Sequence, residues 1–351
     1  MVWVRRHRNV GWLRQLSDIV RLKLCGIGAN TYFTYALFDR QRVSGFAAQR
    51  TFRDFTVSLD FLHFTDRRLL GVGYHKHLFY RLMASFGFPV PEIRAMYCPV
   101  PDGFERHHAM QRPDELARFL RETALPLFGK PSQGSHGEGC RSICERLPNG
   151  LFRMGDDSTA TLDGLVGALH EIALAKGTYL LLERLAPRAD IQALSGEALA
   201  SLRIVTLVRA GVPELVRAVI LLPTAHRYIS NWNQGSEQSL CGAIDLETGR
   251  IHDVLCSLGP DLRHAESHPI TGARVDGHVI GGWSEVVELV LRASLAMAPV
   301  RLQHWDVALT TRGPVLLELN INGDAIPLQM HGPPGILTEQ YVSFAATHRV
   351  W

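Results

Sequence analysis

The last fifty residues of the sequence carry two carboxylates and one amide at a spacing that suits a divalent cation. Asp306 lies in one short apolar run, and Glu318 and Asn320 lie in a second, with a turn-like segment at 310–313 between them. This pattern predicts a β-hairpin. Since side chains alternate along a strand, Glu318 and Asn320 would share one face. We therefore expect three hard oxygen ligands together, a set that suits Mg²⁺. The alternative is a hairpin with an exposed acid and a turn-capping amide.

A glycine-rich segment follows Lys130 and separates two strand-like runs. Glycines let a backbone approach a polyanion closely and present N–H groups to it, and Lys130 can add a positive charge. The segment is neither a P-loop nor a Rossmann fingerprint, since a strand and not a helix is expected after it. A plain glycine-rich hairpin is the alternative. The residues expected to hold phosphate are Lys130, Gly134, Ser135, His136, Gly137 and Gly139, and for His136 simple exposure to solvent is the alternative.

A third candidate segment is the apolar run 178–185, which reads as a buried strand with Glu183 near its end. The carboxylate of Glu183 and the backbone of Arg184 and Leu185 could read the edge of an adenine. Asp190 follows seven residues later and could accept hydrogen bonds from ribose hydroxyls. In the alternative interpretation, Glu183 pairs with a nearby arginine and Asp190 is solvated.

The order of these parts resembles the ATP-grasp superfamily. Within it, the chain is most similar to the sugar-transfer-associated ATP-grasp proteins, relatives of glutamate-ligase-like enzymes. The resemblance covers roughly residues 10 to 340, but residues 320–324 read Asn-Ile-Asn-Gly-Asp where many ATP-grasp ligases have Asn-x-x-Pro-Gly. The narrower resemblance rests on His75-Lys76, Gly87-Phe88-Pro89-Val90-Pro91, Leu202-Arg203-Ile204-Val205-Thr206, Gly242-Ala243-Ile244-Asp245, His268-Pro269-Ile270-Thr271-Gly272, Gly323-Asp324 and Gln329.

This resemblance implies an α+β ATP-grasp fold in which two α+β lobes clamp ATP. The expected domains are an N-terminal helical and pre-ATP-grasp region (1–100), a small lobe with the glycine-rich loop (101–190) and a large lobe with the metal site (191–351). The residue pattern itself predicts a mostly antiparallel sheet over 203–320, with one covering helix near 284–297.

The resemblance also implies an enzyme: an ATP- and Mg²⁺-dependent ligase that joins a small-molecule carboxylate to an amine or related nucleophile through an acylphosphate. Surface-polysaccharide or secondary-metabolite biosynthesis is the implied setting. Lys76 would lie near the family's first phosphate-binding lysine, or else be an exposed lysine at a helix start. Lys130, Arg203 and Arg217 are the expected catalytic cations, and a strand-end salt bridge is the alternative for the arginines. A kinase acting on a small molecule or sugar, and a non-catalytic nucleotide-binding protein, remain open.

Composition narrows the remaining classes. The 351 residues are 46% hydrophobic and 20% charged, which is ordinary for a globular enzyme, and a net charge of +3 does not suggest nucleic-acid binding. Six cysteines show neither a disulfide nor a zinc pattern. No apolar run is long enough to span a membrane, and charges interrupt the first thirty residues where a signal peptide would need an apolar core. We expect a cytoplasmic protein, and the oligomeric state stays open.

The N-terminus combines basic and apolar residues. The Arg5 to Arg8 segment could favour an anionic surface, although a solvated terminus is the preferred interpretation. Residues 12–24 carry a helical apolar stripe and predict a packing helix. The stripe consists of Leu13, Leu16, Ile19, Val20 and Leu24.

Overall fold

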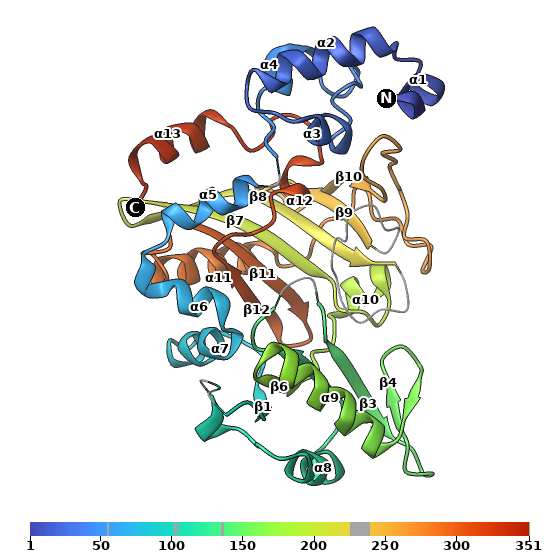
Figure 1. Ribbon diagram of the computed structural model, residues 1–351, viewed down its shortest axis with the longest axis vertical. Coiled ribbons are helices and arrows are strands. Elements are labelled where there is room, and N and C mark those ends of the chain that lie inside the picture. Colours follow the sequence, from blue (N-terminus) through green and yellow to red (C-terminus); the bar gives the residue numbers. More distant parts are fainter. Residues whose placement is uncertain (55, 102, 104, 135–136, 225–238, 351) are drawn as a thin grey trace.

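Two six-stranded antiparallel sheets form the framework of the protein in a computed structural model (Figure 1). The structure describes residues 1–350 except 55, 102, 104, 135, 136 and 225–238. The first sheet is built from residues between 93 and 183, and the second from residues between 201 and 320. Among the described residues, no helix combines the length and the apolarity that crossing a bilayer requires.

The first sheet has the strand order β1-β6-β2-β3-β4-β5. Helices α8 (Pro113–Glu122) and α9 (Leu162–Lys176) pack on one face, where Leu181 of β6 meets Leu120 and Leu169. Leu180 and Leu182 point the opposite way, into the core shared with the second sheet, as strand alternation requires. The strands are β1 (Ile93–Tyr97), β2 (Leu127–Pro131), β3 (Arg141–Arg146), β4 (Phe152–Met154), β5 (Thr159–Ala160) and β6 (Tyr179–Glu183).

The second sheet has the order β10-β9-β8-β7-β11-β12, and one helix, α11 (Trp283–Ala296), covers one of its faces. Ile204 and Trp305 point toward α11, so Arg203 and Asp306 point to the other face. The antiparallel sheet with a covering helix was predicted from the sequence and is confirmed. The strands are β7 (Ser201–Arg209), β8 (Val212–Pro223), β9 (Ser239–Ile244), β10 (Ile251–Leu255), β11 (Leu302–Thr310) and β12 (Gly313–Asn320).

Short helices surround the sheets. The N-terminal four form a cap at one end of the molecule, where Tyr32 and Phe38 pack with Leu221 and Leu255 of the second sheet (Figure 1). The α-helices not yet named are α1 (Val2–Arg8), α2 (Trp12–Lys23), α3 (Ala29–Thr34), α4 (Gly45–Gln49), α5 (Val57–Asp60), α6 (Leu70–Tyr74), α7 (Lys76–Ser85), α10 (Ala189–Ser195), α12 (Ile326–Gln329) and α13 (Glu339–Thr347).

Helix α2 corrects one prediction. The helix forms over the expected residues, but its apolar stripe does not pack: Leu13, Leu16, Val20 and Leu24 are all exposed, and only Ile19 is partly buried. The buried side of the helix holds Gln15, Asp18 and Leu22 instead. The periodicity gave the correct apolar face, but it carries no information about which face the rest of the chain covers.

Candidate functional site

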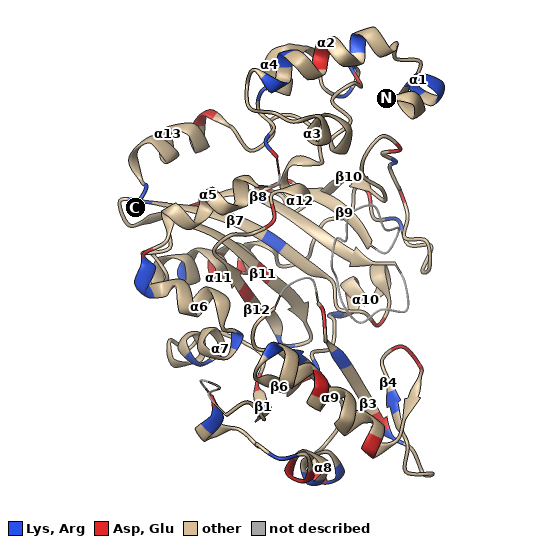
Figure 2. Cartoon of the chain, viewed as in Figure 1, with Lys and Arg blue, Asp and Glu red and all other residues tan. Residues whose placement is uncertain are grey.

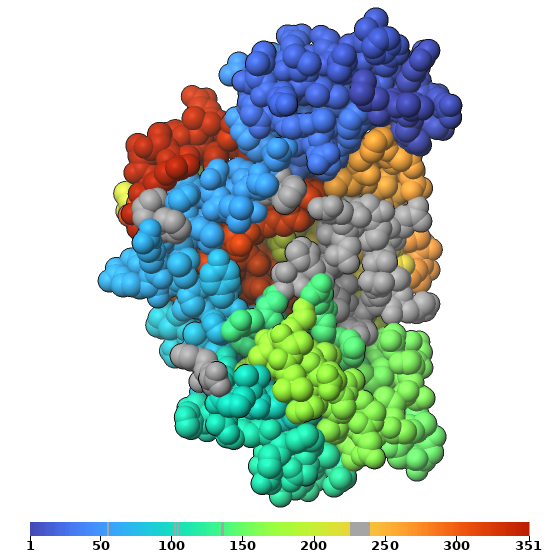
Figure 3. All heavy atoms as spheres, in the orientation of Figure 1, coloured from blue at the N-terminus to red at the C-terminus, as the bar shows by residue number. Residues whose placement is uncertain are grey.

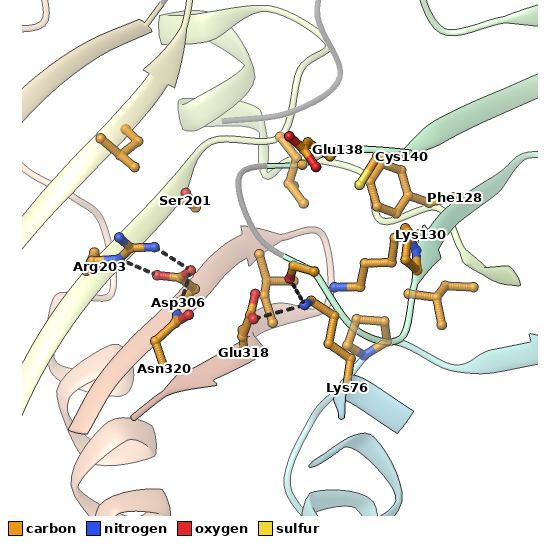
Figure 4. A pocket seen from close by; sticks show the side chains of 18 of the residues that line it. Lys76, Phe128, Lys130, Glu138, Cys140, Ser201, Arg203, Asp306, Glu318 and Asn320 are labelled. Atoms are coloured by element: carbon orange, nitrogen blue, oxygen red, sulfur yellow. Dashed lines mark hydrogen bonds and ion pairs between the residues drawn. The ribbon is translucent and has the colours of Figure 1, made fainter. Parts of the chain in front are cut away.

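A cavity of about 540 Å³ lies between the two sheets, and charged side chains from both sheets and from the start of α7 line it (Figure 4). Lys130 reaches it from β2, Arg203 from β7, and Lys76 from the first residue of α7. The three residues of the predicted metal set, Asp306, Glu318 and Asn320, line it from β11 and β12. Residues from distant parts of the sequence, between 76 and 320, therefore converge on one space.

A row of four charged side chains crosses the floor of this cavity, with two acids in the middle and a base at each end. Strand register places Asp306 directly between Arg203 on β7 and Glu318 on β12. Both nitrogens of the Arg203 fork, Nε and Nη2, donate to the two Asp306 carboxylate oxygens at 2.8 Å. At the other end, Lys76 Nζ lies 3.1 Å from Glu318 Oε1. Each of these two partly buried carboxylates thus has its own cation.

The Arg203–Asp306 pair fixes the charge on the arginine. Burial by itself disfavours the charged guanidinium, but the charge and hydrogen bonds of Asp306 outweigh it and raise the pKa of Arg203 above its usual value. A bidentate pair in a desolvated position is also geometrically specific. Arg203 therefore presents a permanent positive charge beside the predicted metal ligands.

The predicted hairpin is present, and its oxygen ligands share one face. Asn320 Nδ2 donates to Asp306 Oδ2 at 3.2 Å, and Glu318, which lies opposite Asp306 in the strand register, lines the same cavity. Arg203 occupies both Asp306 oxygens, yet each carboxylate oxygen has more than one lone pair and can accept again. Two carboxylates and an amide oxygen are a donor set that fits Mg²⁺. The residues present are therefore compatible with the predicted ion.

The glycine-rich segment joins β2 to β3, an antiparallel pair, as predicted. Gly134, Gly137 and Gly139 all have positive φ, of 126°, 70° and 77°, a backbone conformation that other residues rarely adopt. The first two line the cavity, whereas Gly139 packs against Ile172 and Pro131. Ser135 and His136, both predicted to contact phosphate, lie outside the described residues.

Lys76 and Lys130 approach the cavity from two directions (Figure 4). Lys76 Nζ donates to the Gly134 carbonyl at 2.7 Å, which ties the start of α7 to the glycine-rich segment. Its side chain is only 11% exposed, so the alternative of a solvated helix-start lysine is wrong. Lys130 Nζ lies 5.1 Å from the ring centroid of Tyr80. Two ammonium groups can therefore serve one polyanionic ligand.

A family model described as sugar-transfer associated ATP-grasp matches residues 61–343 of this chain. The chain belongs to this family. The predicted family and the α+β ATP-grasp fold are thereby confirmed. A comparison with curated protein sequences finds no match.

Solved structures with partial likeness to this ATP-grasp protein are ligases and a carboxylase domain. The VanG D-Ala:D-Ser ligase from Enterococcus faecalis has a TM-score of 0.47 at 11% identity, covering 82% of this chain and 64% of that one. The D-alanine–D-alanine ligase from Bacillus anthracis complexed with ATP has a TM-score of 0.40 at 12% identity, and the match covers 74% of this chain and 60% of the ligase. A third structure is the biotin carboxylase domain of the 2-oxoglutarate carboxylase from Hydrogenobacter thermophilus, in complex with MgADP, ADP and bicarbonate. Its TM-score is 0.45 at 14% identity, and the match covers 81% of this chain and 47% of that one. The chain thus spans less than two thirds of each structure.

The predicted hinge, 183–185, lines the cavity of this ATP-grasp protein at the end of β6. The Glu183 carboxylate is already engaged there: its Oε1 accepts from the backbone N–H of Glu92 at 2.9 Å and from Arg312 Nη2 at 2.5 Å. The alternative interpretation of the sequence expected an arginine partner close to Glu183 in the sequence. The arginine found is Arg312, which lies in the turn between β11 and β12. The backbone of Arg184 and Leu185 is therefore the better candidate for contact with a base.

Two predicted site residues are held elsewhere, and their assignments are corrected. Asp190 starts α10 and forms a bidentate pair with Arg188, at 2.6 and 2.8 Å, and does not line the cavity. The hydrogen bonds from Arg188 lower the pKa of the Asp190 carboxyl group. Arg217 donates to the carbonyls of Leu328 and Pro334, holding α12 and the segment after it against β8. Neither the ribose role of Asp190 nor the catalytic role of Arg217 is supported by this geometry.

Sequence reasoning missed a buried polar cluster beside Lys76. His77 Nδ1 lies 2.6 Å from Glu105 Oε1 and 3.0 Å from Ser132 Oγ, and Thr178 donates to Glu105 Oε2. Burial lowers the pKa of His77 to about 4, so the ring is neutral at physiological pH. The cluster holds the end of β2 against α7. The flanking pattern His75-Lys76-His77 was a signal, but Glu105 could not be paired with it from spacing.

Gly323 explains the unusual 320–324 sequence. A Cβ at this position would lie 2.4 Å from Nδ1 of His304, which is fully buried on β11. Only glycine therefore lets the chain cross His304 and return to the cavity, where Asn322 and Asp324 form part of the wall. Burial lowers the pKa of His304 to about 3, with a further contribution from Arg203. The departure from the common ligase motif has a local steric cause.

Proposed function

We propose that the protein is an ATP- and Mg²⁺-dependent ligase that joins a carboxylate to an amine or related nucleophile through an acylphosphate. The observation that carries this proposal is the row formed by Arg203, Asp306, Glu318 and Lys76, which faces the glycine-rich segment across one cavity. Family membership supports the ATP-grasp part of the proposal. The charges support phosphoryl transfer, because that reaction is catalysed mainly by positioning and by neutralisation of oxygen charge.

In the first step, a substrate carboxylate oxygen attacks the γ-phosphorus of ATP. The new O–P bond forms as the bond to the β,γ-bridging oxygen breaks, and ADP leaves with that electron pair. In the second step, the nucleophile attacks the acyl carbon and phosphate departs, while the amine loses a proton. Both steps place charge on oxygens near the cavity floor.

The cations of the chain have distinct roles in this scheme. Lys76 has three N–H donors, of which Gly134 and Glu318 use two, and the third would be available to a phosphate oxygen. Lys130 adds a second charge from β2. Arg203 retains its charge and faces oxygen that becomes negative during acyl transfer.

Asp306, Glu318 and Asn320 are the residues that would hold Mg²⁺. When bound, the ion would neutralise phosphate charge and orient the transferred group. Arg203 holds Asp306 in a fixed orientation for this purpose, and Lys76 does the same for Glu318.

The decisive experiment measures ADP release with candidate acids and nucleophiles, followed by mass analysis of the products. The family description is the reason to include sugar acids and amino sugars among the candidates. A ligase yields ADP, phosphate and a condensed product only when acid and nucleophile are both present. Accumulation of a stable phosphorylated compound without a nucleophile would identify a kinase instead. If the protein bound no nucleotide, both the ligase and the kinase assignments would be excluded.

A further inference from the structure

Helix α2 presents its apolar side to solvent. Leu13, Leu16, Val20 and Leu24 follow one another at intervals of three and four residues, so they form a single stripe along the helix. The exposed fractions of these four residues lie between 46% and 85%, and Trp12 at the start of the helix is 50% exposed. Exposed apolar residues are common singly, but a continuous stripe on one helix marks an interaction surface.

Polar contacts on the opposite side fix this orientation. Gln15 Nε2 donates to the Val10 carbonyl at 2.7 Å, and Asp18 accepts from Arg40 Nη2 at 2.7 Å and from the Tyr32 hydroxyl. Leu22 is fully buried beside them. Rolling the helix to hide its stripe would break these buried hydrogen bonds and leave their groups unpaired. The outward stripe is therefore a property of the folded cap.

The first 24 residues, which include α2, carry an excess of positive charge. Six of the chain's 37 basic residues, but only one of its 34 acidic residues, lie in the first 24 positions, so the remaining chain has more acids than bases. The six bases are all exposed, and Figure 2 shows in blue the basic positions along α1 and α2. They are Arg5, Arg6, Arg8, Arg14, Arg21 and Lys23.

The cap also has a suitable position. Helix α2 lies across one extremity of the molecule, and the N-terminal residues form a rounded end in the space-filling view (Figure 3). Among the described residues, none before Ser58 lines the cavity, so α2 forms no part of its wall. Contact of α2 with a broad surface would leave the cavity walls unchanged.

We propose that the N-terminal cap docks on an anionic lipid surface, with α2 lying flat in the headgroup region. Leu13, Leu16, Val20 and Leu24 enter the acyl boundary, and the basic residues meet lipid phosphates. Trp3 and Trp12 have the amphipathic rings that favour this interface. A second copy of the chain is a poorer occupant, because it would bring the same concentration of positive charge against itself.

The test is co-sedimentation of the full chain with vesicles. We expect binding to vesicles of phosphatidylglycerol and phosphatidylcholine in equal parts at least about tenfold stronger than to phosphatidylcholine alone, and weakened by high salt. The double variant Leu16→Ser/Val20→Ser should lose at least about tenfold in partitioning, because two side chains no longer enter the acyl boundary. Leu174→Ser/Leu295→Ser is the matched control, since both leucines are exposed on other helices, and it should bind as the wild type does.

A second variant separates charge from apolar insertion. Arg5→Gln/Arg6→Gln should weaken binding and reduce its salt dependence, while circular dichroism confirms that each variant is folded. Equal binding by the wild type and the stripe variant would overturn the proposal. Failure of the wild type to bind anionic vesicles would also overturn it. This second outcome includes the case in which the stripe mediates a dimer, which sedimentation would detect. The outcome is independent of the proposed ligase activity.

Discussion

Two bidentate arginine–aspartate pairs in this protein have nearly the same geometry and very different settings. Arg203 and Asp306 lie 103 residues apart, on neighbouring strands, with 15% of each side chain exposed inside the cavity. Arg188 and Asp190 lie two residues apart at the start of α10, are about twice as exposed, and stay outside the cavity. A local pair forms wherever two neighbours can reach each other. A pair that needs a complete sheet to bring its members together is the stronger indication of a built site.

The largest expected effect is on stability, at the non-local pair. Arg203→Ala leaves the Asp306 carboxylate partly buried without its cation, so the free energy of unfolding should fall by about 3–5 kcal/mol. The matched change Arg188→Ala should lower it by about 0–1 kcal/mol, because its partner can be solvated. Urea unfolding followed by circular dichroism measures both values. Similar losses for the two variants would remove the distinction drawn between the pairs.

The next effect is on activity. Glu318→Gln keeps the size of the side chain but removes one charge from the proposed Mg²⁺ set, and Asp306 keeps Arg203. Substrate-dependent ADP release should fall by about a hundredfold or more, with a higher Mg²⁺ requirement and little change in folding. Glu288→Gln, on the exposed side of α11, is the control and should retain full activity. Turnover of Glu318→Gln at the wild-type rate would reject the metal assignment.

The contrast between the pairs also explains how far the sequence could lead. The β11–β12 hairpin and the β2–β3 loop were predictable because turn residues and strand alternation act over a few positions. The pairing of Arg203 with Asp306 depends on the register of β7 against β11, which no local pattern specifies. For the same reason the contact of Arg312 with Glu183 and the outward turn of α2 were not foreseen. The errors at Asp190 and Arg217 arose where a residue type fitted a role but its partners lay elsewhere.

A smaller effect is expected from pH, at another buried non-local pair. The folded-state pKa of His77 is lowered to about 4, below the ordinary value of 6.5, because burial disfavours the charged ring. The unfolded chain therefore binds more protons between these values, and stability should fall as pH drops from about 6.5 to 4. The slope should approach about 1.4 kcal/mol per pH unit. His77→Gln should reduce that slope in denaturant titrations at several pH values, whereas replacement of the exposed His252 should not. An unchanged slope would contradict the assignment.

The smallest effect is expected at the local pair of Arg188 and Asp190. Nucleotide affinity should depend on the backbone at Arg184 and Leu185 and not on Asp190. The carbonyls near Arg184 and Leu185 can accept from the adenine amino group, whereas guanine presents a carbonyl at that edge and would leave an acceptor unpaired. ATP should therefore bind about tenfold more tightly than GTP. Asp190→Asn should change neither affinity by more than about twofold and should lower stability by about 0–1 kcal/mol, since the pair with Arg188 is partly solvated. Calorimetric titration with non-hydrolysable analogues measures both affinities. If Asp190→Asn weakened ATP binding tenfold, the residue would have to contact nucleotide after a rearrangement that brings α10 to the cavity. Equal affinity for ATP and GTP would remove the base pocket at 183–185 while leaving the charged row on β7, β11 and β12 untouched.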